Sequence, residues 1–368
     1  MALLNYYKDN KDGIATLIYM SRNWNDFDYY YIKAYFDKNI VVPENILKSN
    51  CKIAINFEWE PFNYVVDQIY IDVINKHNID PKRILLLSEN ADLLDHISLI
   101  AKKHNKELIN YEWTNIAEHT IKLQTFNNLT TFIDLQKNKF DIKKIFLSFN
   151  RRWRLHRPFF IALCIANKIL DQGYVSIGVS DDEQTWDKIL PTILEISKND
   201  DVFYTLLSNN YDSIINTPYL YLDTDDLITP RHQLNYDDIK YENTFSLYKQ
   251  SLISIVSETL FFENQGRFFS EKTFKPISYM HPFIFVGPAN SLSLLKTLGY
   301  KTFHPFINEE YDSILDPINR LKLIMEELKK LCNKSPEEII SFKKNTYDIC
   351  KFNHSHLLTR TVYNHKII

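Results

Sequence analysis

Glycine is scarce in this chain, with six residues among 368. No G-x-G-x-x-G sequence and no P-loop sequence occurs. Both motifs depend on glycine to bring the backbone close to phosphate groups. Their absence argues against nicotinamide dehydrogenases and P-loop kinases.

Cysteine is also rare and widely spaced. The four cysteines, at positions 51, 164, 332 and 350, form no C-x-x-C pair. This spacing argues against a zinc site and a disulfide framework, so we expect free thiols in a reducing compartment. No apolar run is long enough to cross a bilayer. We therefore expect a soluble protein without a membrane span that works in the cytoplasm.

Charge of one sign is not in excess. The formal net charge is −3 at pH 7, which argues against a general nucleic-acid coat and against a basic protein of membrane surfaces. The hydrophobic content of 45% and the charged content of 24% are typical of a soluble globular protein. A chain of 368 residues exceeds one ordinary domain, so we expect two.

The first part of the chain alternates apolar, strand-like runs with amphipathic, helix-like runs. Strands are predicted at Lys52–Phe57 and Arg83–Leu87, and helices at Phe62–Asn75 and Ala91–Lys103. Such alternation predicts an α/β domain with a mostly parallel sheet, which binds ligands at the carboxyl ends of its strands. We place this domain at residues 1–140.

Two carboxylates and an indole directly follow the first of these strands, in the sequence Phe57-Glu58-Trp59-Glu60-Pro61. A carboxylate at the mouth of a cleft can act as a general base when its surroundings set its pKa. Glu58 and Glu60 are therefore the catalytic candidates. The alternative is a solvated loop with a packing tryptophan.

An arginine cluster opens the second predicted domain, residues 141–368. A strand is predicted at Lys144–Phe149, and a helix from Pro158. Four of the ten arginines fall between them, within seven residues: Arg151, Arg152, Arg154 and Arg157. A phosphate group commonly binds between a parallel strand and a helix start. The alternatives are a solvated basic loop and phosphate contacts to nucleic acid, which the low net charge disfavours.

The most informative stretch lies between residues 254 and 287. It predicts a buried strand at Ser254–Thr259, a polar loop, a short helix capped by Ser270, and a second strand at Pro282–Val286. Glu271 suits the positive end of that helix. A strand, a loop and a helix N-terminus in this order favour the binding of an anion such as a diphosphate.

Two further features concern a metal and the end of the chain. The segment Asp223-Thr224-Asp225 follows an apolar run and is similar to the D-x-D that holds a divalent metal in one glycosyltransferase architecture. A metal-dependent transferase is therefore one alternative. The interpretation that we favour below has no metal site. Helical periodicity predicts two long terminal helices, at about Asp316–Cys332 and Ser335–Phe352.

A family resemblance emerges in the central stretch. The segments Phe262–Gln265, Phe269–Lys272 and His281–Gly287 resemble the nucleotide-sugar motif of the α1,3/α1,4-fucosyltransferases. In that family, F-E-N-S precedes Y-[VT]-T-E-K, a helix and a V-P-V-V-x-G strand. Here Gln265 replaces the serine, and Pro276 falls inside the helix. Phage and viral proteins with a similar S-E-K-T-F-K-P-I core belong to the same broad group.

The resemblance implies a fold and an activity. The fold is GT-B, an α/β architecture with two Rossmann-like domains that face a cleft, here with C-terminal helices. The activity is an inverting, metal-independent transfer of fucose or a similar sugar from a nucleoside diphosphate, with a GDP-sugar favoured and no other cofactor. The acceptor would be a hydroxyl group of a glycan or glycoconjugate.

The resemblance also implies residue roles. Glu271 corresponds to the glutamate that holds the donor ribose, and Lys272 to the phosphate-binding lysine. Arg154 or Arg157 would take the role of an arginine that follows a strand ending in S-N, and the catalytic carboxylate of the N-terminal domain would be Glu58 or Glu60. The donor-binding candidates are Arg151, Arg154, Arg157, Glu263, Asn264, Ser270, Glu271 and Lys272.

Elementary electrostatics agrees with this interpretation. Without a metal, the charge that develops on a departing nucleoside diphosphate must be met by arginine, lysine and a helix N-terminus. Three alternatives stay open: the D-x-D metal-dependent transferase, a phage-type DNA-modifying glycosyltransferase, and a non-catalytic module that binds a sugar nucleotide or a glycan.

Overall fold

The structure is a computed structural model that describes residues 29–33, 40–57, 64–113, 115–127, 141–150, 152–177, 185–220, 222, 241–261 and 266–360. The chain forms two compact units. Unit 1 comprises Met1–Ile116, Asn264–Phe268 and Thr361–Ile368, and unit 2 comprises Ala117–Glu263 and Phe269–Arg360. The domain boundary that the sequence predicts, at residue 140, lies outside the described ranges.

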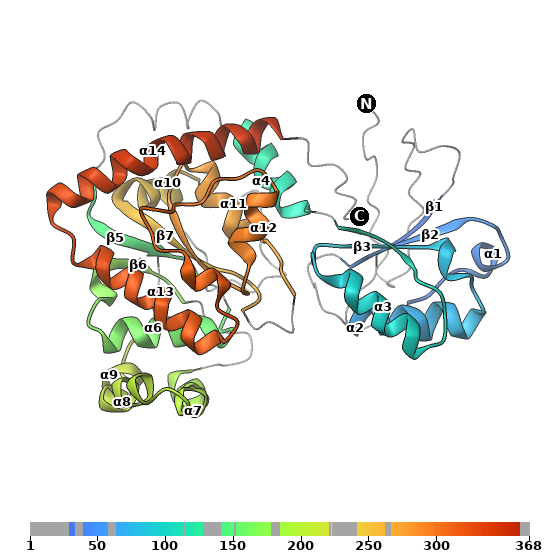
Figure 1. Cartoon of the computed structure of the whole chain (residues 1–368), viewed down its shortest axis with the longest axis horizontal. Coiled ribbons are helices and arrows are strands. Elements are labelled where there is room, and N and C mark those ends of the chain that lie inside the picture. Colours follow the sequence, from blue (N-terminus) through green and yellow to red (C-terminus); the bar gives the residue numbers. More distant parts are fainter. Residues whose placement is uncertain are drawn as a thin grey trace. The chain divides into compact units, whose positions relative to one another are not determined.

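Unit 1 contains a four-stranded parallel sheet in the order β1-β2-β3-β4 (Figure 1). Its strands are β1 (Tyr29–Lys33), β2 (Lys52–Phe57), β3 (Ile84–Ser88) and β4 (Asn110–Trp113). Its helices are α1 (Glu44–Leu47), α2 (Tyr64–Ile69), a π-helical turn at Tyr70–Asn75, and α3 (Leu93–Lys103). Ile53, Ile55 and Leu86 of the sheet pack with Val66 and Ile97 of the helices in one buried core. The spacing of these apolar residues, two in the strands and about 3.6 in the helices, explains the α/β layering.

Unit 2 contains a second four-stranded parallel sheet, in the order β6-β5-β7-β8. Its strands are β5 (Lys144–Ser148), β6 (Gly173–Val175), β7 (Ser251–Ser257) and β8 (Phe283–Val286). The chain moves from β5 to β6 on one side and then returns past β5 to β7 on the other. Such a reversal is a topological switch point, and ligands bind in the crevice at the carboxyl ends of the two strands that flank it. In unit 2 these strands are β5 and β7.

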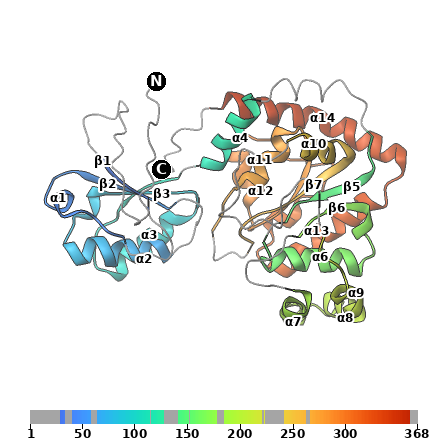
Figure 2. The ribbon, with the colours of Figure 1, turned by 180° about the vertical axis from the view of Figure 1, so that it is seen from behind.

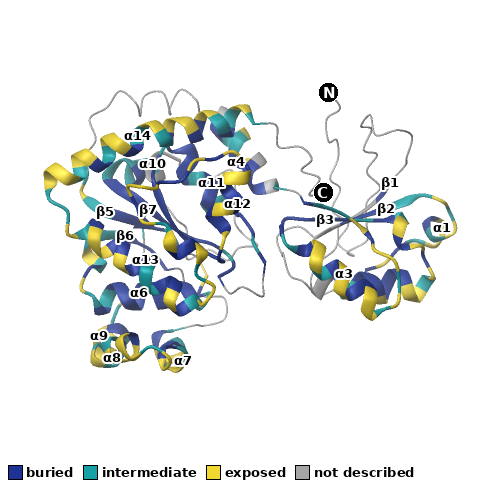
Figure 3. Cartoon of the chain, in the orientation of Figure 1, coloured by how far each residue is buried: buried dark blue, intermediate teal, exposed yellow. Residues whose placement is uncertain are grey.

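Unit 2 also contains helices, some of which cover the two faces of this second sheet. They are α4 (Ile116–Asn127), α6 (His156–Ala166), α7 (Trp186–Ser197), α8 (Asp201–Asn209), α9 (Tyr211–Ile215), α10 (Tyr241–Gln250), α11 (Glu271–Ser278), α12 (Ser291–Thr297), α13 (Pro317–Cys332) and α14 (Pro336–Thr359). In the two opposite views, α10 and α14 lie on one side of the sheet and α6 on the other, with α7, α8 and α9 beyond α6 (Figure 1 and Figure 2). Every residue of β7 and β8 is therefore buried (Figure 3), as is typical of parallel strands covered on both faces.

The α/β class with parallel sheets is confirmed, and several elements match their predicted bounds. Strand β2 has the predicted range, and α14 is capped at Ser335, where a helix is predicted to start, but it continues to Thr359. The short helix α11 contains Pro276, as predicted. All four cysteines are described and are free thiols. Within the described ranges, no helix combines the length and apolar character that a bilayer crossing requires.

Candidate functional site at the carboxyl edge of the second sheet

Buried polar side chains gather where the strands of unit 2 end. Ser148 ends β5 and Asn150 follows it, Ser176 follows β6, and Ser257 ends β7 with Glu258 next to it. All five are at most 1% exposed. Nδ2 of Asn150 donates to Oγ of Ser148 at 2.9 Å. Buried polar groups need hydrogen-bond partners, so a cluster of five at one edge of the sheet is a candidate ligand site.

Arg157 brings a buried positive charge to this edge. It lies in the first turn of α6, directly after the arginine-rich loop, and is 2% exposed. Its Nη2 donates to the backbone carbonyl oxygens of Ser257 at 3.2 Å and Glu258 at 3.0 Å. Burial lowers the pKa of Arg157 to about 10, Arg154 adds to this effect, and Glu258 opposes it. The guanidinium therefore remains charged at neutral pH.

Three buried polar atoms at this edge have no hydrogen-bond partner among the described residues. They are Nε of Arg157, Oδ1 of Asn150 and Oγ of Ser257. Leu147 of β5 pairs with Ser254 of β7, and Asn150 and Ser257 each lie three residues further along their segments. Most buried polar groups in folded proteins are paired. A guanidinium donor, an amide acceptor and a hydroxyl at one strand edge therefore favour a ligand site here.

The start of α11 adds charged groups of both signs. Ser270 is the N-cap, as predicted, because its Oγ accepts from the backbone N–H of Lys272 at 3.2 Å. Nζ of Lys272 lies 3.2 Å from Oγ of Ser270 and 3.0 Å from Oε1 of Glu271. Burial alone would raise the pKa of Glu271, but Lys272 and then Lys275 lower it to about 2. Glu271 is thus ionised at neutral pH, and its side chain is still 41% exposed.

Glu258 is a functional candidate that the sequence analysis missed. Its Oε1 accepts from the backbone N–H of Ser270 at 2.9 Å and from Oγ1 of Thr273 at 2.5 Å. Its Oε2 accepts from the backbone N–H of Thr259 at 3.0 Å. The N–H of Ser270 at the predicted anion-binding helix start is therefore used within the protein, as is that of Lys272. The available signal was an ionisable residue inside the predicted strand Ser254–Thr259, a strand that the structure ends at Ser257.

The structure brings together only part of the predicted site. Arg154 and Arg157 lie at the start of α6, and Ser270, Glu271 and Lys272 at the start of α11. Arg157 donates to the carbonyl oxygen of Glu258 and Ser270 donates to its carboxylate, so the two helix starts meet at this residue. Other candidates lie outside the described residues: Glu58, Glu60, Arg151, Glu263, Asn264 and the D-x-D pair Asp223 and Asp225. Among the residues that are described, no group of three or more His, Cys, Asp or Glu side chains is placed to hold a metal ion.

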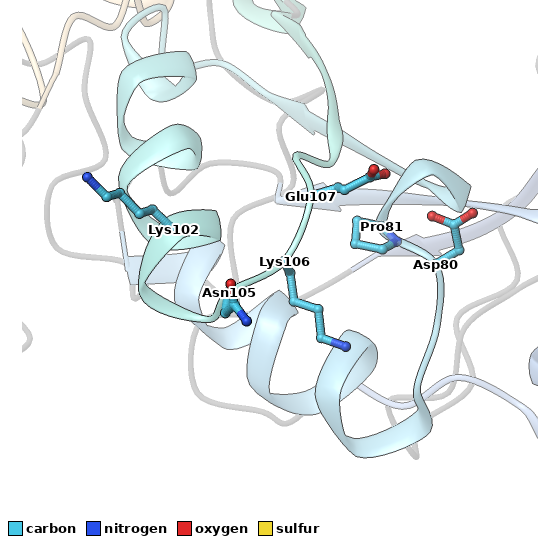
Figure 4. Close-up of a pocket in the computed structure, with 6 residues that line it drawn as sticks. All are labelled: Asp80, Pro81, Lys102, Asn105, Lys106 and Glu107. Atoms are coloured by element: carbon cyan, nitrogen blue, oxygen red, sulfur yellow. The ribbon is translucent and has the colours of Figure 1, made fainter.

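A surface hollow of about 640 Å³ occurs elsewhere, in unit 1 (Figure 4). Its lining residues are Asp80, Pro81, Lys102, Asn105, Lys106 and Glu107. Pro81 precedes β3 and Glu107 precedes β4, so the hollow lies at the amino ends of these strands. Parallel α/β sheets bind ligands at the opposite, carboxyl ends. The hollow is therefore not our candidate site.

Comparison with known proteins gives only distant structural similarity. No protein-family model matches the sequence, and no curated protein is significantly similar to it. The N-terminal domain of Candida albicans trehalose-6-phosphate phosphatase aligns with a TM-score of 0.41 and 11% identity, over 90% of this chain and 68% of that one. An α,α-trehalose-phosphate synthase (UDP-forming) from Burkholderia xenovorans aligns with a TM-score of 0.41 and 10% identity, over 90% and 72%. The α,α-trehalose-6-phosphate synthase of Burkholderia multivorans aligns with a TM-score of 0.42 and 8% identity, over 90% and 68%.

Proposed function

We propose that this chain is a GT-B glycosyltransferase that moves a sugar from a nucleoside diphosphate donor to a hydroxyl group. One juxtaposition carries the proposal: Arg157 and the Ser270-Glu271-Lys272 helix start both lie at the carboxyl edge of the second sheet, beside its switch point. This is where an open parallel sheet binds a nucleotide. The motif that resembles the fucosyltransferases supplies the same helix start.

The charges suit a diphosphate. Arg157 and Lys272 are cations on two different helix starts, and Arg154 adds a third close to Arg157. When the bond between the sugar and the diphosphate breaks, its electron pair moves to the diphosphate, and fixed cations stabilise the charge that develops there. Glu271, ionised and partly exposed, is suited to accept hydrogen bonds from ribose hydroxyls.

The finer assignments rest on the sequence motif. They comprise an inverting, metal-independent mechanism, fucose or a similar sugar, a GDP donor, and a glycan or glycoconjugate acceptor. Arg151, Glu263 and Asn264 would complete the donor site. Glu58 or Glu60 would accept the proton of the acceptor hydroxyl as its oxygen attacks the anomeric carbon of the sugar.

A transfer assay tests the proposal. The protein is incubated in EDTA with GDP-fucose, other nucleoside diphosphate sugars and a panel of glycan acceptors, and the anomeric configuration of the product is determined. We expect transfer with inversion, and we expect Glu58→Gln or Glu60→Gln to abolish transfer while donor binding is retained. Donor binding without transfer or hydrolysis would favour a binding module. Transfer that needs Mn²⁺ would favour the D-x-D alternative, and salt-dependent duplex binding would favour a DNA-modifying enzyme.

A further inference from the structure

We propose that Glu258 is a positioning residue that sets the distance between the two cationic helix starts that would bind the donor diphosphate. The inference rests on the proposed function and deepens it. It starts from geometry, because Glu258 is fully buried and contacts both helices. The sequence motif does not include this residue.

The side chain of Glu258 holds the start of α11. It accepts one hydrogen bond from the N-cap residue, Ser270, and another from Thr273 in the first turn. In a usual capping box, a glutamate inside the helix accepts the N–H of the N-cap residue. Here the carboxylate comes from the end of β7 instead, so Lys272 is fixed relative to that strand.

The backbone of Glu258 holds the start of α6. Its carbonyl oxygen accepts from Nη2 of Arg157 at 3.0 Å and from Nε2 of His156 at 2.8 Å. Its own N–H donates to the carbonyl oxygen of Val286, the last residue of β8, at 2.9 Å. One residue thus connects α6, α11 and β8 at a single point. Since binding depends on how accurately charged groups are placed, this connection would set the fit of a diphosphate between Arg157 and Lys272.

The direction in which diphosphate binding changes separates a positioning role of Glu258 from a purely electrostatic one. Glu258 is a buried carboxylate close enough to Arg157 to affect its pKa. Acting only as a charge, it would repel a bound diphosphate, and its neutralisation would strengthen binding. Acting as a positioning residue, its neutralisation weakens binding, because a glutamine amide replaces one acceptor oxygen by an N–H₂ group that cannot accept from a backbone N–H.

The test is diphosphate binding by Glu258→Gln, measured by calorimetry with GDP, UDP and inorganic pyrophosphate. We expect dissociation constants that rise about tenfold or more, as for the loss of a charge-assisted hydrogen bond. The matched control is Glu327→Gln, which removes another buried carboxylate of unit 2. Glu327 lies on α13 and accepts from the N–H of Asn308 at 3.0 Å. Unchanged or tighter binding by Glu258→Gln would overturn the proposal.

A second pair of variants works where Glu258→Gln does not fold. Thr273→Val removes the hydroxyl that donates to Glu258, whereas Thr273→Ser keeps it. We expect weaker diphosphate binding by Thr273→Val only. Equal binding by the two variants would contradict the proposed role.

Hydrogen exchange separates failure of this inference from failure of the proposed function. In free Glu258→Gln, or free Thr273→Val if Glu258→Gln does not fold, we expect faster exchange in peptides that cover the starts of both α6 and α11, with no such change in Glu327→Gln. A wild-type protein that binds no diphosphate would refute the proposed function. Hydrogen exchange would then still show whether Glu258 couples the starts of α6 and α11. Faster exchange at one helix start only, or at neither, would overturn the role of Glu258.

Discussion

Nη2 of Arg157 lies 3.0 Å from the backbone carbonyl oxygen of Glu258, so a buried cation is tied to the end of strand β7. A carbonyl oxygen carries only a partial charge, and it orients the guanidinium without neutralising it. The positive charge therefore stays available to an anion at the carboxyl edge of the sheet.

This geometry predicts that Arg157→Lys is not a conservative change. Nη2 of Arg157 donates to the carbonyl oxygens of Ser257 and Glu258 while Nη1 donates to that of Arg152 at 3.3 Å, and lysine, with one terminal nitrogen, cannot make both sets of contacts. We expect a lower melting temperature and an affinity for nucleoside diphosphates that falls about tenfold or more, measured by calorimetry. Arg152→Lys is the control, because Arg152 is exposed. Equal affinities of the two variants would contradict the assignment of Arg157.

Substitution of Lys272 tests the second cationic group of the proposed diphosphate site. We expect Lys272→Ala to weaken diphosphate binding by about 10- to 100-fold, since a hydrogen bond to a charged group contributes about 1.5–3 kcal/mol. Lys296→Ala, which removes a lysine that is 53% exposed on α12, controls for the loss of one positive charge. Titration calorimetry at two salt concentrations should show a smaller salt dependence for Lys272→Ala alone. The assignment is wrong if both variants bind like wild type.

Substitution of Glu271 tests whether this carboxylate recognises the ribose of the donor. Its pKa of about 2, which Lys272 and Lys275 keep low against the effect of burial, means that it is an acceptor-only carboxylate at neutral pH. We expect wild type to bind GDP more tightly than 2′,3′-dideoxy-GDP, and Glu271→Gln to reduce this preference. Affinity for pyrophosphate should not fall in the variant. If the preference for ribose is unchanged in Glu271→Gln, another residue holds the ribose.

The surroundings of His281 predict that the folded protein loses stability in mild acid. It is 5% exposed, its Nε2–H donates to the carbonyl oxygen of Ser251 at 2.9 Å, and its Nδ1 accepts from Ser254 at 2.8 Å. Burial lowers its pKa to about 3, against the hydrogen bond to Ser251. The unfolded chain, with a histidine pKa near 6.5, takes up the proton first. This contribution to stability is therefore complete above about pH 6.5 and decreases as the pH falls towards 3, by at most about 1.4 kcal/mol per pH unit.

Urea unfolding at pH 7, 6 and 5 measures this effect. We expect the free energy of unfolding to fall with pH in wild type and to fall less steeply in His281→Gln. The slope should not vanish, because burial, with Arg157 nearby, also lowers the pKa of His156. An identical slope in the two proteins would mean that His281 does not titrate as its surroundings indicate.

The fold class was predictable because buried parallel strands appear in a sequence as short apolar runs. Strand β2 was predicted with its observed bounds for this reason. Strand β4 was missed, since Asn110–Trp113 has mixed polarity at the edge of its sheet. The helix predicted at Phe62–Asn75 continues from α2 into a π-helical turn at Tyr70–Asn75, and periodicity alone does not separate these two geometries.

The candidate site was predictable where its chemistry is local in the chain. Ser270 and Lys272 were found because an N-cap and its first turn are adjacent in sequence. Glu258 was missed, since its partners Arg157 and Thr273 meet it only through tertiary packing. Its separation from Arg157 is 101 residues, and no short motif records such a contact.

Thermal unfolding with a panel of nucleoside diphosphates in EDTA tests the central claim most directly. A ligand at a hundred times its dissociation constant adds about 2.7 kcal/mol to the free energy of unfolding. We predict that GDP or another nucleoside diphosphate raises the melting temperature of wild type in EDTA and does not raise that of Lys272→Ala. No stabilisation by any diphosphate, or stabilisation only when Mn²⁺ is present, would contradict the account.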